Sequence, residues 1–149
     1  MAERNVYLDT SAIVKRYMVE TGTETVDIIF KDALNKKLKM CFSFWNVGEA
    51  IGIFDKYDRR AAKKSILIRK FLNELKTLKD TGSFDSVDIS PWAVAEAMTY
   101  LLRYHLYIAD ALQIVSCKSA NCTEFITADR RLADAAKAEG IQSTLLTTH

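Results

Sequence analysis

The 149-residue chain is poor in the residue types on which several common kinds of site depend. It has two histidines, His105 and His149, so catalysis by a Ser–His or Cys–His pair has little support. Its three cysteines are an odd number and lack the short paired spacing of a zinc site, so we interpret Cys41, Cys117 and Cys122 as reduced core thiols. Any chemistry must therefore rest on acidic side chains.

Long apolar runs are missing as well. No apolar stretch approaches the roughly 20 residues of a membrane span, and the N-terminal residues lack the apolar region of a secretory signal. With 49% hydrophobic and 27% charged residues, the chain has the composition of a globular protein. We therefore expect a single domain covering residues 1–149, located in the cytoplasm and without a membrane partner.

The sequence does contain short apolar runs that end at an acid. Val6–Leu8 is followed by Asp9, and the run that begins at Phe125 is followed by Asp129. Such runs are typical of strands that are buried on both faces of a parallel sheet. Because open α/β sheets bind ligands at the carboxyl ends of their strands, Asp9 is placed for chemistry. The alternative is that Asp9 only caps the helix that follows it.

Extended and helical patterns alternate along the rest of the chain. Strands are predicted at Val6–Leu8, Leu38–Phe42, Val87–Ile89, the run from Phe125, and Ser143–Thr147. Helices are predicted at Ala12–Tyr17, from a capping box at Thr21–Glu24 to Leu34, at Phe44–Tyr57 after Ser43, within Lys56–Lys79, from Pro91 after Ser90, around Ile108–Val115, and after Asp129 to Ala138. This alternation predicts a three-layer α/β/α sandwich around a mainly parallel five-stranded sheet.

The predicted helix Phe44–Tyr57 is apolar on nearly every side, so we expect it to be largely buried. It contains Glu49, and because a buried carboxylate without a partner is costly, a cation or metal is expected near it. Gly48 and Gly52 lie one turn apart and favour a close approach of a neighbouring backbone.

Charge is segregated along the chain. The segment Lys56–Lys79 holds nine basic residues against two acids, a net charge of +7, whereas the whole chain carries +2. Its apolar residues keep helical spacing, which predicts an amphipathic helix with a basic outer face. Such a face can bind phosphates, and the alternative is that it is only a solvated surface.

Four acids occur where burial alone would not place them, namely Asp9, Glu49, Asp110 and Asp129. Asp110 could simply interact with the dipole of the helix that it begins. If the four converge, however, they repel one another, and one would become protonated unless a divalent cation neutralised them. An all-oxygen set suits Mg²⁺ or Mn²⁺, ions that activate water for attack on phosphodiesters.

The segments around these acids resemble PIN-domain ribonucleases and, within that family, the VapC-type toxins of toxin–antitoxin modules. The matching segments are Tyr7–Ala12, Asn46–Ala50, Tyr107–Ile114, Ile126–Leu132 and Ala138–Ile141, which together span nearly the whole chain. The resemblance implies a central Asp9 strand with the Asp129 strand beside it. It also implies Mg²⁺- or Mn²⁺-dependent cleavage of RNA, usually by a homodimer that an antitoxin protein inhibits.

On this resemblance the four acids are the candidate catalytic residues. Asp9, Asp110 and Asp129 are candidate metal ligands, directly or through water, and Glu49 is a candidate ligand or water-orienting base. Residues placed to support the ligands or touch substrate are Thr10, Ser11 and Thr127, and those placed to bind RNA are Arg59, Lys63 and Arg69.

The chain departs from the family pattern at one point. Many relatives carry a further acid just after the fourth, whereas here Arg130, Arg131 and Leu132 follow Asp129. A second metal ion is therefore in doubt.

Three other functions compete with a toxin. A phosphotransferase with Asp9 as nucleophile is disfavoured, because haloacid-dehalogenase-like enzymes have a second Asp two residues later and this chain has Ser11. A PIN-like module that binds RNA or protein without cleaving it, and a stand-alone RNA-processing nuclease, stay open as alternatives.

Overall fold

The computed structural model describes residues 3–57 and 62–146 and has a five-stranded, wholly parallel sheet. The strands are β1 (Asn5–Leu8), β2 (Lys39–Phe42), β3 (Phe84–Ser86), β4 (Glu124–Thr127) and β5 (Gln142–Leu145), in the order β3-β2-β1-β4-β5. The sheet is central because β1, β2 and β4 are short apolar runs whose last three residues are all buried. The predicted central position of the Asp9 strand, with the Asp129 strand beside it, is confirmed.

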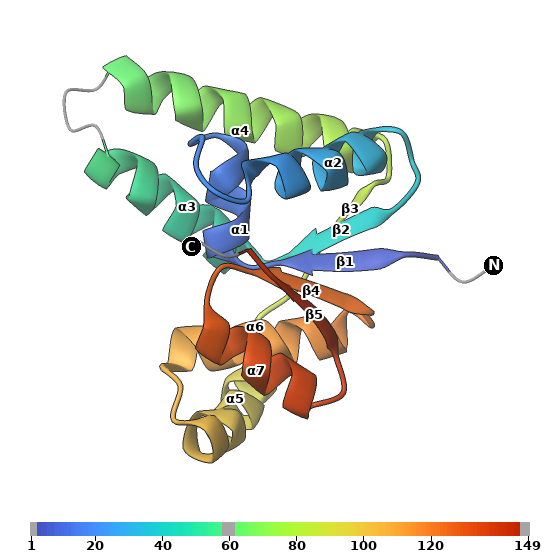
Figure 1. The fold of residues 1–149 in the computed structure, drawn as a ribbon, viewed down its shortest axis with the longest axis vertical. Helices are drawn as coiled ribbons and strands as arrows, with labels where there is room; N and C mark the ends of the chain where they lie inside the picture. Colours follow the sequence, from blue (N-terminus) through green and yellow to red (C-terminus); the bar gives the residue numbers. More distant parts are fainter. Residues whose placement is uncertain (1–2, 58–61, 147–149) are drawn as a thin grey trace.

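Helices cover both faces of this sheet, which confirms the predicted three-layer sandwich (Figure 1). They are α1 (Thr10–Ile13), α2 (Thr23–Leu34), α3 (Phe44–Tyr57), α4 (Ala62–Asp80), α5 (Pro91–Tyr104), α6 (Ile108–Ser119) and α7 (Arg130–Ala138), with a 3-10 turn, η1 (Val14–Arg16), after α1. Figure 1 shows α1, α2 and α4 on one face and α5, α6 and α7 on the other, with α3 extending from the carboxyl ends of the strands. Among the described helices, none combines the length and apolar character that crossing a bilayer requires.

Two of the predicted strands are misplaced. The third strand is Phe84–Ser86 rather than Val87–Ile89, because this edge strand buries only Phe84 and leaves two polar residues exposed. The last strand is Gln142–Leu145 rather than Ser143–Thr147, and Thr147 lies outside the described residues. Edge strands carry a weak apolar signal, which explains both shifts.

The capping box predicted at Thr21–Glu24 is wrong. Helix α2 begins at Thr23, its N-cap is Gly22 at φ 98°, and no side chain caps it. The Thr23 hydroxyl instead accepts from the Glu20 backbone N–H at 3.0 Å and donates to the Lys15 carbonyl at 2.8 Å. The predicted helix Ala12–Tyr17 is also divided, into α1 and η1. The caps predicted for α5 are confirmed, since Ser90 accepts from the Ala93 N–H and Pro91 follows it.

Helix α3 is less buried than its composition predicts. Phe44 and Trp45 are 60% and 49% exposed, while the buried side consists of Asn46, Val47, Ala50 and Phe54. The predicted close approach at the glycines is not found within the described residues, because a Cβ added at Gly48 or Gly52 would meet nothing within 4 Å. The outer side of α3 is therefore open.

This open side predicts that Gly52→Ala stabilises the protein. Alanine has the higher helix propensity and meets no neighbour here, so the free energy of unfolding should rise by about 1 kcal/mol. The matched control is Gly82→Ala, where φ is 75° and the same added methyl should destabilise through backbone strain. Urea denaturation of both variants measures whether each substitution raises or lowers the free energy of unfolding. A destabilised Gly52→Ala protein would mean that this side of α3 is covered in solution.

A charged cluster fixes the helices on the lower face in Figure 1 to one another. Glu139, at the end of α7, accepts from Lys118 of α6 at 2.8 Å and from Arg103 of α5 at 2.7 Å, and the Tyr104 hydroxyl donates to it as well. The hydrogen bond from Lys118 is the main cause that lowers the pKa of Glu139 to about 2. Since α6 carries Asp110 and α7 follows Asp129, the cluster holds two of the candidate site acids in a fixed relation.

The three cysteines are confirmed as core thiols. Cys41, Cys117 and Cys122 are all buried, and none forms a disulfide.

Candidate active site

The four predicted acids lie at one place, the carboxyl edge of the sheet. Asp9 follows β1 and Asp129 follows the neighbouring β4, while α3 brings Glu49 and α6 brings Asp110. All four line one cleft of about 220 Å³, together with Thr10, Ser11, Ile53 and Gln113. Of the described residues that line it, none is basic. The parallel order of β1 and β4 thus brings together acids that are 120 residues apart in the sequence.

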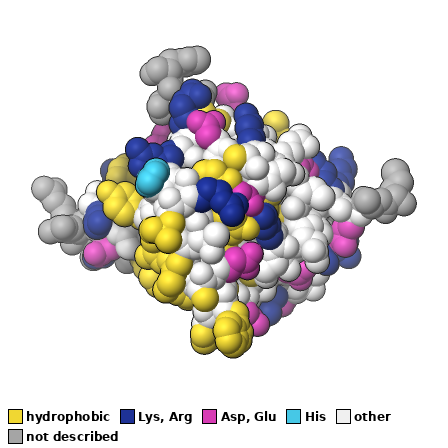
Figure 2. All heavy atoms as spheres, turned by 90° about the horizontal axis from the view of Figure 1, so that it is seen from below, with side chains coloured by type: hydrophobic (Ala, Val, Ile, Leu, Met, Phe, Trp, Pro, Cys, Tyr) yellow, Lys and Arg dark blue, Asp and Glu magenta, His cyan; other side chains and the backbone are white. Residues whose placement is uncertain are grey.

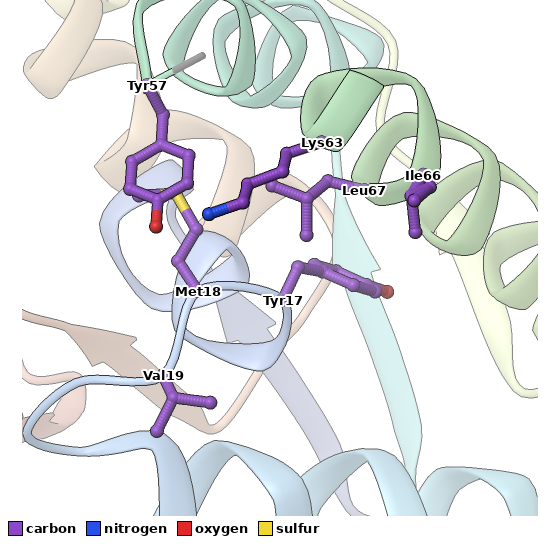
Figure 3. A pocket seen from close by; sticks show the side chains of 7 residues that line it. All are labelled: Tyr17, Met18, Val19, Tyr57, Lys63, Ile66 and Leu67. Atoms are coloured by element: carbon purple, nitrogen blue, oxygen red, sulfur yellow. The ribbon is translucent and has the colours of Figure 1, made fainter.

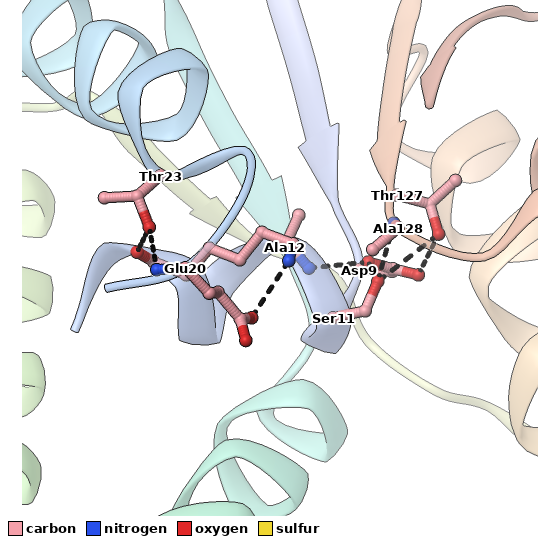
Figure 4. Close-up of polar contacts among 8 residues, drawn as sticks. Asp9, Ser11, Ala12, Glu20, Thr23, Thr127 and Ala128 are labelled. Carbon is pink, nitrogen blue, oxygen red and sulfur yellow. Dashed lines mark hydrogen bonds and ion pairs between the residues drawn. The ribbon is translucent and has the colours of Figure 1, made fainter. Parts of the chain in front are cut away.

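Asp9 is the most buried of these acids, with 5% of its surface exposed. One carboxylate oxygen accepts from the Ser11 hydroxyl at 2.7 Å and from the Ala12 N–H at 3.0 Å. The other accepts from the Thr127 hydroxyl at 2.5 Å (Figure 4). The hydrogen bond from Ala12 makes Asp9 the N-cap of α1, so its capping role is real.

Burial governs the ionisation of Asp9. It raises the pKa of this carboxyl to about 6, against the lowering effect of the hydrogen bonds from Thr127 and Ser11, and the nearby charge of Asp129 raises it further. The ammonium of the buried Lys15 forms an ion pair with Glu20 at 2.9 Å. Asp9 therefore lies in a site that favours a bound cation.

Thr127, one of the predicted supporting residues, connects the carboxyl ends of β1 and β4 through hydrogen bonds. Its buried hydroxyl donates to Asp9 and accepts from the Asp129 N–H at 3.0 Å, while the Ser11 hydroxyl accepts from the Ala128 N–H at 2.9 Å. Asp129 itself is exposed and caps α7 through the Leu132 N–H at 3.2 Å. These contacts fix where the Asp9 and Asp129 backbones lie relative to each other.

Asp110 and Glu49 form the helical side of the cleft. Half-buried Asp110 has a raised pKa, first because of burial and then because Asp129 and Glu49 repel its charged form. The cation expected near Glu49 is not found in the described residues, where Glu49 is only partly buried and its partner is the Thr10 hydroxyl at 2.8 Å. The acids of the cleft thus repel one another, and none has a basic partner among the described residues.

A buried polar network beneath the cleft was not predicted from the sequence. The Asn46 amide nitrogen donates to the Thr10 hydroxyl at 3.0 Å and to the Gln113 side-chain oxygen at 2.7 Å. The Tyr7 hydroxyl lies 2.7 Å from that Gln113 oxygen, within donating distance. Since Asn46 donates to Thr10, the Thr10 proton is left to point at Glu49, so the network sets the orientation of Glu49. Its sequence signal is an amide in each of two apolar helices.

The oxygen donors of the cleft fit a hard divalent cation. Asp9, Asp110, Asp129 and Glu49 supply carboxylates, and Thr10 adds a hydroxyl. Among the residues that the structure describes, however, no three His, Cys, Asp or Glu side chains already stand together as a ligand set. The site is thus chemically suited to Mg²⁺ or Mn²⁺ but is not preassembled around one.

Neither of the described residues predicted to bind RNA, Lys63 and Arg69, lines this cleft. Arg59 lies outside the described residues, exposed Lys63 lines a separate apolar groove, and Arg69 is exposed on α4. The basic helix predicted within Lys56–Lys79 is confirmed as α4, with Phe71, Leu75 and Leu78 buried.

An α/β/α sandwich with an acidic cleft at the carboxyl edge of its sheet defines the class of the protein. The PIN domain family matches residues 6–138, and the chain belongs to this family. PIN domains are generally nucleases and typically use divalent metal ions.

Two solved structures share the fold. PAE2754 from Pyrobaculum aerophilum is 20% identical, with a TM-score of 0.57 over 96% of this chain and 92% of that one. FitAcB from Neisseria gonorrhoeae is 16% identical, with a TM-score of 0.63 over 93% of this chain and 95% of that one. No curated protein matches the chain significantly.

Proposed function

We propose that the protein is a metal-dependent endoribonuclease and the toxin of a type II toxin–antitoxin pair. The observation that carries this proposal is the cleft itself, in which four carboxylates meet in a chain of the PIN domain family, with no basic side chain among the described lining residues. The resemblance of its motifs to VapC-type toxins supports the finer assignment.

Each acid has a role in this proposal. Asp9, Asp110 and Asp129 would hold Mg²⁺ or Mn²⁺, which supplies neutralisation of the carboxylates and an activated water for phosphodiester hydrolysis. Glu49 is a further ligand or the base that orients the water, and Thr10 keeps its carboxylate in position. Ser11 and Thr127 hold Asp9 through its two oxygens. One metal ion is favoured, because basic residues follow Asp129 and the next acid, Asp134, is exposed on α7.

The test is cleavage of separate labelled pools of tRNA, rRNA and mRNA in the presence of Mn²⁺. Fragments at defined sites in one pool support the nuclease and name its substrate. Binding without cutting in every pool would instead support the non-catalytic module. The structural argument against that module is that all four acids line the same cleft.

An antitoxin is the proposed protein partner, and an apolar groove offers a place for it (Figure 3). The groove has a volume of about 350 Å³ and is lined by Tyr17, Met18, Val19, Tyr57, Lys63, Ile66 and Leu67. Helix α3 connects the groove to the cleft. Four-residue steps along it separate Glu49 and Ile53, which line the cleft, from Tyr57, which lines the groove. The cleft and the groove therefore lie along the same side of α3. A partner segment with apolar anchors in the groove could therefore extend an Arg toward the acids.

The groove lies at the ends of α3 and η1 and the start of α4, and no residue of α2 is among the described residues that line it. Ile66→Glu is therefore expected to abolish the complex with the protein encoded by the neighbouring reading frame while leaving RNA cleavage intact. Ile66 is 63% exposed, so the change should not unfold the chain. Co-purification after co-expression measures the complex.

The matched control is Ile28→Glu, which changes an isoleucine that is 60% exposed on α2. Loss of the complex in this variant and not in Ile66→Glu would show that the apolar anchors of the partner bind α2 instead of the groove. A neighbour that neither binds nor inhibits would favour a stand-alone RNA-processing nuclease.

A homodimer is also part of the proposal. Helix α5 presents Trp92, Met98 and Leu102 to solvent at 83%, 53% and 72% exposure. Figure 2, which views the molecule from below Figure 1, shows hydrophobic side chains gathered on this face. Large contiguous apolar patches are uncommon on monomers, so this side of α5 is the surface that a second copy would cover.

A further inference from the structure

The first turn of α7 carries two arginines beside the acidic cleft. Arg130 and Arg131 directly follow Asp129, both are exposed, and the turn contains no acid. Basic residues at a helix N-terminus oppose the helix dipole, so this placement reduces the stability of α7. Because this arrangement lowers the stability of α7 without an evident structural gain, it indicates that the two arginines have a functional role.

These arginines also lack the carboxylate partners that others have. Arg4, Arg16 and Arg103 form ion pairs with Glu124, Glu74 and Glu139, respectively. In the described part of the chain, Arg130 makes no hydrogen bond or ion pair, and Arg131 makes only a 3.4 Å hydrogen bond to the His105 carbonyl. Two guanidinium groups are therefore available to an external anion.

The contact with His105 places Arg131 next to the loop that leads into α6. Asp129 of the cleft directly precedes the arginines, and Asp110 of the cleft lies in the first turn of α6, so the two arginines belong to the segments that carry these acids and lead to them. Figure 2 shows Lys or Arg side chains beside the histidine on this face of the molecule. The described residues that line the cleft include no basic side chain, so binding of a polyanion needs cations beside it.

We propose that Arg130 and Arg131 bind the RNA phosphate next to the one that is cleaved. A guanidinium fork can bind a phosphate through two parallel hydrogen bonds, which positions the chain as well as attracting it. The inference rests on the proposed ribonuclease function, because it names how that site holds its substrate. The arginines are positioning residues, and the acids remain the catalytic ones.

The test compares Arg130→Ala/Arg131→Ala with Lys31→Ala/Lys37→Ala, a control that removes the same charge from exposed positions in α2 and in the turn after it. Affinity is measured by fluorescence anisotropy with labelled RNA in EDTA, which removes the metal ion that the proposed cleavage requires, so the anisotropy reports binding alone. For the α7 variant we expect Kd and KM to rise about tenfold with kcat nearly unchanged, and the salt slope to fall by about 0.7 for the one lost phosphate contact. Its Tm should stay or rise, because a charge opposed to the helix dipole is removed.

Equal Kd, KM and salt slope in the α7 variant and the wild type would overturn the inference. A fall in Tm that accompanies the loss of binding would also overturn it, because the arginines would then be structural. Arg130→Lys/Arg131→Lys keeps the charge and should restore the salt slope. If the wild type binds RNA but does not cut it, the proposed function fails, while the binding measurements still decide this inference.

Discussion

Asp9→Asn is expected to abolish RNA cleavage and, at the same time, to stabilise the metal-free protein. The substitution removes the most buried carboxylate of the cleft and with it a proposed ligand for a hard cation. It also removes the repulsion from Asp129. The amide keeps an oxygen for Ser11 and Ala12, and its nitrogen can donate to the Thr127 hydroxyl, so the local hydrogen bonds can be rebuilt.

The stability gain should depend on pH in a defined direction. The pKa of Asp9 is about 6 in the folded protein against an ordinary value of 3.8, so the folded state binds more protons between these values. The wild type therefore loses stability as pH rises from about 4 to 6, by about 3 kcal/mol, and asparagine does not. Urea denaturation in EDTA should show equal stabilities near pH 3.5 and a more stable variant above pH 6.

The matched control is Asp134→Asn, which makes the same chemical change at an exposed position on α7. It should leave activity and the pH dependence unchanged. Wild-type activity in a pure Asp9→Asn preparation would contradict the assignment of Asp9 as a ligand.

Asn46→Ala is expected to have the largest effect on stability. The Asn46 side chain is fully buried, donates to Thr10 and Gln113, and accepts from the Ser43 N–H at 3.0 Å and the Ser43 hydroxyl at 2.9 Å. Alanine leaves several buried polar groups without partners, which should lower the free energy of unfolding by about 3 to 5 kcal/mol.

The same substitution should also slow cleavage. Without the Asn46 donor, the Thr10 hydroxyl is free to turn away from Glu49, and loss of such supporting contacts typically costs about 10- to 100-fold in activity. Denaturation curves and kcat at a temperature where the variant remains folded separate the two effects. Asn73→Ala, at an exposed position on α4, is the control. A variant with normal stability would mean that the buried network contributes little.

The acids of the cleft could be predicted because their sequence context is unusual. Asp9 and Asp129 each end an apolar run, and parallel strands place such residues at one edge of a sheet. Glu49 and Asp110 are charged residues within apolar helices. The sequence could not predict which way Asn46 and Gln113 point, because an amide in a helix is as compatible with solvent as with a buried network.

Some elements were mispredicted for related physical reasons. The sequence pattern of β3 is not apolar, because two of its residues are the polar Asp85 and Ser86, which an edge strand can leave exposed. The open side of α3 looked buried because Phe44 and Trp45 are apolar, and composition cannot distinguish a core from a surface that a partner covers. The start of α2 depended on a backbone turn at Gly22 rather than on a side-chain cap.

The central claim is that the acidic cleft cleaves RNA with a divalent metal ion. The most direct measurement is the rate of RNA cleavage by the wild-type protein in EDTA and after stepwise addition of Mn²⁺, with Asp9→Asn measured in parallel. The account predicts no cleavage in EDTA, a rate that rises with Mn²⁺ to a plateau, and no cleavage by the variant at any Mn²⁺ concentration. Cleavage that persists undiminished in EDTA would contradict it.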